Sequence, residues 1–63
     1  GKVDINKRKA SIPVRYDMWE AGKLPLDGDT IYATVGNNTE EGRVRDCEPD
    51  NDRTIIYWEL VRV

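Results

Sequence analysis

The C-terminal segment RTIIYWELVRV, residues 53–63, limits what this chain can fold into more than any other part of the sequence. Its β-branched and aromatic residues predict a strand, in which successive side chains point to opposite faces of a sheet. Both faces are apolar, with Ile56, Trp58 and Leu60 on one and Ile55, Tyr57, Val61 and Val63 on the other. We expect the first set to form the core stripe, with Trp58 at its centre. The second set then needs the bend of a closing barrel or another protein to cover it.

The segments that come before it predict further short elements. Residues 11–16, SIPVRY, alternate apolar and polar side chains and predict a strand. Pro13 places that strand at a sheet edge, because proline donates no backbone hydrogen bond. Asp17 and Gly22 then suit the start and the end of a short helical turn.

A strand and a hairpin are predicted after this turn. Residues 29–35 alternate again and predict the strand, whereas the polar loops are residues 36–42 and 48–52. Residues 42–47 and 53–63 are expected to form an antiparallel hairpin whose second arm is the longer. The alternation breaks at the end of the first arm, which predicts a β-bulge near Asp46.

A chain of 63 residues has room for one small domain. We divide it into residues 1–10, a basic N-terminal arm or weak edge strand, and residues 11–63, a single small β-domain. Short strands, polar turns and one helical turn predict an all-β fold. We expect a small SH3-like barrel or a strongly bent antiparallel sheet of about four or five strands.

One stretch resembles a known family. GDTIYATVGNNTEEGRV, Gly28 to Val44, is similar to the pattern of KOW and related SH3-like barrels, in which a Gly-Asp pair, an alternating strand, a glycine loop and a Gly-x-Val step follow one another. Here the loop lacks the basic residue usual in that family, and Gly42 is one residue out of step. The resemblance covers about a quarter of the chain and implies a ribosome, RNA or transcription-complex partner.

The residue types present argue against catalysis. The chain has no histidine, one serine (Ser11) and one cysteine (Cys47), so no Ser-His or Cys-His nucleophilic pair can form within it. Its glycines are scattered and build no phosphate-binding loop. Acidic residues alternate in DCEPDND, but Asn51 and Tyr57 stand where a calcium loop needs glycine and glutamate. We predict no enzyme activity, no catalytic residue, no metal site, no cofactor and no small-molecule substrate.

Cysteine content and hydropathy indicate the cellular location. A single cysteine favours a reducing compartment. The sequence also lacks a leader-like segment and any apolar run of the ~20 residues that a membrane span needs. We therefore expect a cytoplasmic protein without membrane contact.

The aromatic residues suggest a protein-binding role, because Trp, Tyr and Arg are enriched at interface hot spots. The predicted partner-binding residues are Trp19, Tyr57, Tyr32, Arg43 and Arg45. Trp19, which follows a strand in a short turn, is an aromatic anchor or a lid over the core. We expect a small intracellular accessory protein, an adaptor, inhibitor or assembly subunit. Homo-oligomers through the second apolar face of residues 55–63 or through the Pro13 edge are also considered.

Two alternatives concern nucleic acids. An RNA- or DNA-binding barrel would use its basic arm and strand arginines: Lys7, Arg8, Lys9, Arg43, Arg45 and Arg62. The net charge of −2 and the pI near 5.0 argue against it, and the arginines would otherwise pair across strands with Asp46, Glu59 or Glu41. An acidic mimic of nucleic acid would use Asp27, Asp29, Glu40, Glu41, Asp46, Glu48, Asp50 and Asp52.

Overall fold

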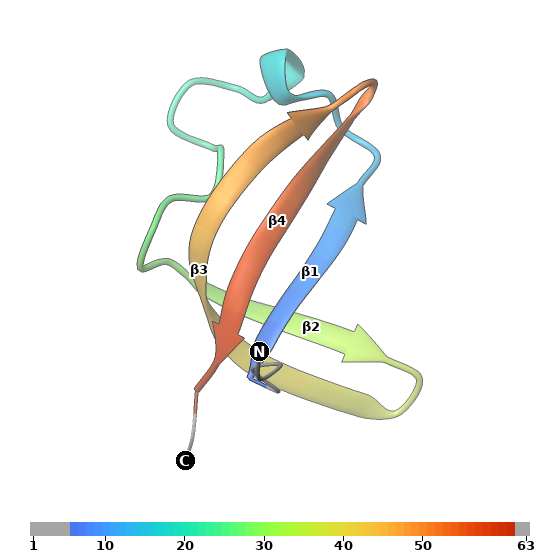
Figure 1. The fold of residues 1–63 in the computed structure, drawn as a ribbon, viewed down its shortest axis with the longest axis vertical. Coiled ribbons are helices and arrows are strands. Elements are labelled where there is room, and N and C mark those ends of the chain that lie inside the picture. Colours follow the sequence, from blue (N-terminus) through green and yellow to red (C-terminus); the bar gives the residue numbers. More distant parts are fainter. Residues whose placement is uncertain (1–5, 62–63) are drawn as a thin grey trace, which may run out of the picture.

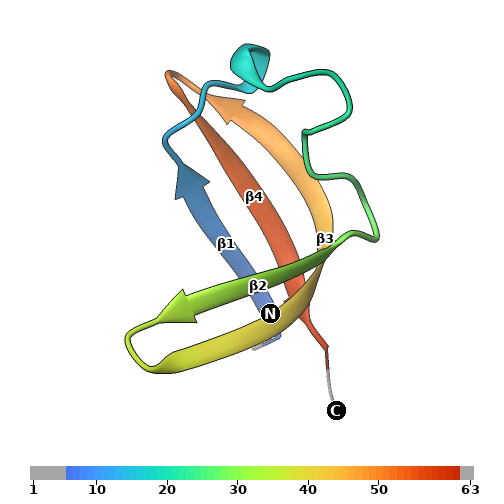
Figure 2. The same cartoon turned by 180° about the vertical axis from the view of Figure 1, so that it is seen from behind.

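The protein folds into one curled antiparallel sheet, seen in a computed structural model that describes residues 6–61 (Figure 1). Its elements are β1 (Lys7–Ile12), a 3-10 turn η1 (Tyr16–Met18), β2 (Thr30–Val35), β3 (Asn38–Asp50) and β4 (Arg53–Leu60). The strand order is β1-β4-β3-β2. In both Figure 1 and Figure 2, the hairpin of β2 and the first half of β3 runs across the direction of β1 and β4. The predicted all-β class, the strong bend and the short helical turn are confirmed.

The bend is carried by β3, which is long enough to serve both parts of the sheet. Its first half pairs with β2 and its second half with β4, and the register shifts between Val44 and Asp46. This shift confirms the predicted bulge, which inserts Arg45 and increases the local twist. The prediction that the second arm of the hairpin is the longer is wrong. The first arm, β3, has 13 residues, whereas β4 has 8.

Both predicted polar loops are shorter than expected because strand pairing overrides the weak preferences of their residues. Most of residues 36–42 belongs to β3, and only Gly36 and Asn37 connect β2 to it. Gly36 has a φ of 60°, the left-handed conformation that a type II′ hairpin turn requires at its first central residue. The other loop shrinks to Asn51 and Asp52, and Asn51 adopts a φ of 57°.

The first strand ends earlier than the alternation predicts. β1 stops at Ile12, and the backbone N–H of Val14 donates to the carbonyl of Ile12 at 2.7 Å, which closes a tight turn around Pro13. Extension of this strand to residue 16 is therefore wrong, whereas its edge position is confirmed. The helical turn shrinks to Tyr16–Met18 and has no side-chain cap, so the capping role predicted for Asp17 is also wrong.

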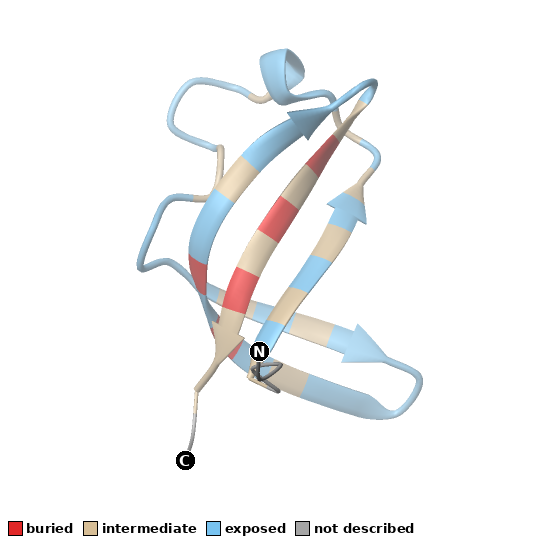
Figure 3. Ribbon diagram, in the orientation of Figure 1, coloured by how far each residue is buried: buried red, intermediate tan, exposed pale blue. Residues whose placement is uncertain are grey.

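The core lies on one face of the sheet, here called the inner face. Val44, Ile56 and Trp58 are buried there, and Trp58 is 6% exposed, which confirms its predicted place. Figure 3 shows the buried positions alternating with half-buried ones along β4. Of the half-buried positions, Ile55 and Tyr57 lie on the opposite or outer face, whereas Leu60, the third residue expected in the core stripe, lies on the inner face opposite Gly42. β4 lies between β1 and β3, so side chains of both neighbours flank its own on each face and reduce their exposure.

Candidate functional site

The outer face of the sheet brings together residues from all four strands. Residues that pair across antiparallel strands share a face, so the register defines this surface. Its rows are Lys7-Glu59-Arg43-Thr30, Lys9-Tyr57-Asp46, Ser11-Ile55-Glu48 and Glu41-Tyr32. Positive, negative and aromatic side chains therefore alternate over one continuous surface.

Three of the five predicted partner-binding residues lie on this outer face. Tyr32 is 67% exposed on β2, Arg43 is exposed on β3, and Tyr57 is half-buried on β4. Within residues 6–61, the guanidinium of Arg43 has no hydrogen bond or ion pair. Arg43 is therefore available to a ligand, with a tyrosine on the neighbouring strand.

Arg45, the extra residue of the bulge, is tied to acidic residues. Its guanidinium lies 3.5 Å from a carboxylate oxygen of Asp27 and 3.8 Å from one of Glu59. The cross-strand pairing expected for the arginines is thus found for Arg45 with Glu59. Both contacts are exposed, and such pairs contribute about 0–1 kcal/mol each. Arg45 can exchange these partners for a ligand at little cost.

Tyr57 is oriented by a neighbour on the adjacent strand. Its hydroxyl donates to Oε1 of Glu48 at 2.5 Å. This hydrogen bond to a carboxylate is the main reason that the pKa of Tyr57 is raised. The phenol is therefore a neutral donor with a defined direction at the middle of the outer face.

Trp19 lies away from this surface and is half-buried. Its indole N–H donates to Oγ1 of Thr54 at 2.9 Å, and the Thr54 hydroxyl donates to the carbonyl of Val14 at 2.6 Å. The thiol of Cys47 donates to the carbonyl of Pro25 at 3.3 Å. These contacts hold the connection between β1 and β2 against the end of the core. Trp19 was considered as an aromatic anchor for a partner or as a lid over the core, and its hydrogen bond to the buried Thr54 fits the lid.

Sequence reasoning missed Thr54, which is completely buried at the start of β4. A threonine within a strand is ordinary, so its position carried no signal. The one available clue to its burial was the alternation of side chains, which places Thr54 on the same face as Ile56 and Trp58.

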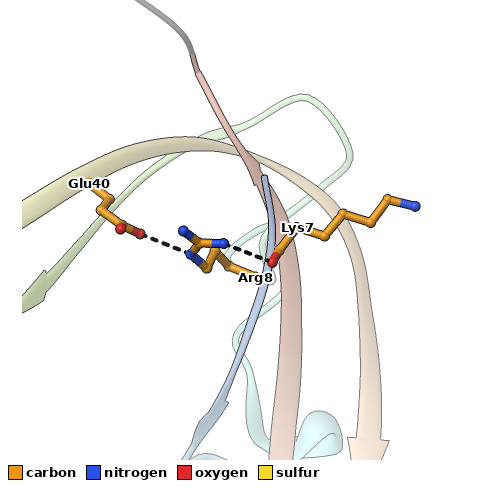
Figure 4. Close-up of polar contacts among 3 residues, drawn as sticks. All are labelled: Lys7, Arg8 and Glu40. Atoms are coloured by element: carbon orange, nitrogen blue, oxygen red, sulfur yellow. Dashed lines mark hydrogen bonds and ion pairs between the residues drawn. The ribbon is translucent and has the colours of Figure 1, made fainter. Parts of the chain in front are cut away.

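The basic residues proposed for nucleic-acid binding are divided between the two faces. Lys7 and Lys9 lie on the outer face, where Lys9 is opposite Tyr57. Arg8 lies on the inner face, where its Nε is 3.3 Å from Oε2 of Glu40 and its Nη1 donates to the carbonyl of Lys7 at 3.2 Å (Figure 4). The remaining member, Arg62, is outside the described residues.

The Arg8–Glu40 pair crosses the open side of the curled sheet, where β1 faces the β2–β3 hairpin. A cavity of about 430 Å³ lies there. Its apolar lining includes Ala10, Ala33, Val35 and Trp58. The cavity lies beside the two strands at the edges of the sheet, β1 and β2.

Several acidic residues make local contacts. Asp27 pairs with Arg45, Asp29 accepts from the N–H of Leu26 at 2.9 Å, and Asp46 accepts from the N–H of Cys47 at 2.8 Å.

Across the described part of the chain, no cluster of three or more potential ligand residues could hold a metal ion. The same residues include no helix with the length and apolarity to cross a membrane.

Comparisons with known proteins give no match: no family model fits the sequence, and neither the curated proteins nor the solved structures include a significant relative. The resemblance of residues 28–44 to KOW barrels is therefore not accompanied by a match to any family model.

Proposed function

We propose that this chain is a small non-catalytic module that binds another protein through the outer face of its sheet. The observation that supports the proposal is the presence of Tyr32, Arg43 and Tyr57 on one face of three neighbouring strands. Tyrosine and arginine combine large contact area with directed hydrogen bonds, which explains their frequency in binding hot spots. The sheet fixes the backbone of these residues before binding, so the entropy lost on binding is mainly that of their side chains.

The charge pattern narrows the partner's chemistry. Glu41 and Glu59 lie beside Arg43 and Tyr32 in the strand pairing, so the surface presents both signs at close spacing. A complementary partner carries acidic groups opposite Arg43 and basic groups opposite the glutamates. Such a mixed surface suits an adaptor, inhibitor or assembly subunit, the roles expected of an intracellular accessory protein.

Nucleic-acid binding is the second candidate. It is favoured by the presence of Lys7, Lys9 and Arg43 on the same face as Tyr57, where a base could stack beside phosphate-binding cations. Binding to an oligothymidylate at low salt, with affinity that falls steeply as salt rises, would support this candidate. No binding at low ionic strength would exclude it.

The protein-binding proposal is tested by affinity capture from an extract of the source organism. The wild type is compared with Tyr32→Ala/Arg43→Ala and with Lys23→Ala, a control in the exposed connection between β1 and β2. We expect a nuclease-resistant protein partner that the wild type and the control recover and the double variant loses at least about tenfold. A partner that all three recover equally would show that the outer face is not the binding surface.

A further inference from the structure

The sheet has two edges, and they differ in how well they are protected against another strand. β1 carries Lys7 and Lys9 and is followed by Pro13. Charged side chains and proline are the usual means by which edge strands avoid pairing with another chain. The edge formed by β1 is therefore protected.

The other edge, β2, has no such protection. Its sequence TIYATV contains no charged residue, no proline and no glycine, and four of its six residues are β-branched. Tyr32 and Val35 are 67% and 80% exposed. One side of its backbone pairs with β3, and no described strand pairs with the other side. Short neutral segments of high β-propensity are those that add strands most readily.

We infer that the free edge of β2 is a self-association site, at which β2 of a second copy pairs antiparallel to it and joins two sheets into one. A two-fold axis perpendicular to the sheet keeps inner faces with inner faces. Because side chains alternate along a strand, the two-fold axis must then pass beside one residue of β2, which lies opposite itself in the partner subunit, and not between two residues. The two central choices are Tyr32 opposite Tyr32 of the partner subunit, and Ala33 opposite Ala33 of the partner subunit.

Charge and side-chain type fit a second copy in both registers. When Tyr32 is central, Ile31 is opposite the partner's Ala33 and Thr30 is opposite the partner's Thr34. When Ala33 is central, Ile31 is opposite the partner's Val35. Apolar residues thus meet apolar ones on the inner face, and β2 opposes no like charges, which would be destabilising.

The cavity on the open side of the sheet gives this edge a further gain on pairing. Ala33 and Val35 of β2 line it, and Val35 is largely exposed in the single chain. A strand added beside β2 shields these residues from water while it satisfies the unpaired backbone groups. Pairing at the edge leaves Arg43 and Tyr57 of the outer face open, whereas Tyr32 belongs to both surfaces. Self-association is measured by sedimentation and partner binding by capture, so failure of one is distinguishable from failure of the other.

Sedimentation velocity over a range of protein concentrations tests the inference. We expect the 7.3 kDa chain to show a reversible monomer–dimer equilibrium. Tyr32→Lys/Thr34→Lys places like charges near one another across the interface and should weaken dimerisation at least about tenfold, the equivalent of 1.4 kcal/mol. Asn37→Lys/Asn38→Lys adds the same charge at the hairpin turn and should leave the equilibrium close to that of the wild type.

Hydrogen exchange in the wild type provides a second readout that needs no variant. The amides on the free edge of β2 should exchange more slowly as protein concentration rises, whereas those of β1 should not change. A wild type that stays monomeric up to ~1 mM would overturn the inference. Its dissociation constant would then be above ~1 mM, which corresponds to less than about 4 kcal/mol of binding free energy. A dimer that forms without protection of β2, or that the lysines leave intact, would overturn it as well.

Discussion

The indole of Trp58 occupies the space in which a side chain at Gly42 would have to lie. A Cβ at residue 42 would overlap Cδ1 of Trp58 and lie 2.8 Å from the carbonyl oxygen of Glu59. Gly42 is buried on β3, next to the position where β3 passes from β2 to β4. The largest core side chain therefore packs directly on the backbone of the bent strand.

Gly42→Ala should therefore destabilise the fold by about 2–3 kcal/mol, because neither the indole nor the carbonyl of β4 can move without disturbing the core. Urea unfolding measures the loss. Glu41→Ala is a suitable control, because residue 41 precedes Gly42 on the same strand and is exposed on the opposite face. Equal stability of Gly42→Ala and the wild type would mean that Trp58 packs elsewhere.

Thr54→Val should cost about 1–3 kcal/mol although it keeps the shape of the side chain. The change removes the hydroxyl that accepts from Trp19 and donates to the carbonyl of Val14, and leaves both groups without this partner. Thr54→Ser keeps the hydroxyl and is the matched control. If the valine and serine variants unfold at the same urea concentration, the hydrogen bonds are not what holds the lid.

Stability should decline in alkali through Cys47. Burial raises the pKa of its thiol, and the carboxylates of Asp46 and Asp29 raise it further. The folded state then binds its proton more tightly than the unfolded state, so stability falls as pH rises. The stability that Cys47 contributes in this way is fully present below the ordinary thiol pKa of about 8.5. It is lost as the pH rises through the higher pKa of the thiol in the folded state.

Urea unfolding of the wild type and of Cys47→Ser at pH 7 and pH 10 measures this contribution, because serine does not titrate in that range. Tyr57 also has a raised pKa but is present in both proteins, so the difference between them reports the thiol. Parallel pH dependence of the two proteins would contradict the prediction.

The Arg8–Glu40 pair should contribute little to stability even though it joins β1 to the β2–β3 hairpin. Both side chains are partly exposed, and pairs of this kind are worth less than about 1 kcal/mol. A double-mutant cycle of Arg8→Gln and Glu40→Gln isolates the pair, because Arg8 has other contacts. We expect a coupling energy below about 1 kcal/mol that decreases with added salt, and a larger, salt-independent value would contradict this.

The alternation of side chains accounts for what could be predicted of the fold. It assigned Ile56 and Trp58 to the core, and its break predicted the bulge near Asp46. Turn-forming residues were a poorer guide, because residues 38–42 and 48–50 gain more from pairing with neighbouring strands than from forming loops. Strand lengths depend on such partners, which lie far away in the sequence.

For the candidate site, a single sequence could not place Trp19. Its role depends on Thr54, 35 residues away, and on the carbonyl of Val14. The division between Arg8 on the inner face and Lys7 and Lys9 on the outer face follows from the same alternation, once the register of β1 against β4 is known.

The sequence by itself determined the all-β class, the core stripe of the last strand and the absence of a histidine-based nucleophilic pair, because these depend on local alternation and on residue types. Only the tertiary structure decided that β4 is the central strand and that β2 forms an unprotected edge. On the second face of β4, Ile55 and Tyr57 are half-buried without barrel closure, because side chains of β1 and β3 lie beside them on that face. Strand order decides this, and it is set by long-range pairing that no local pattern encodes.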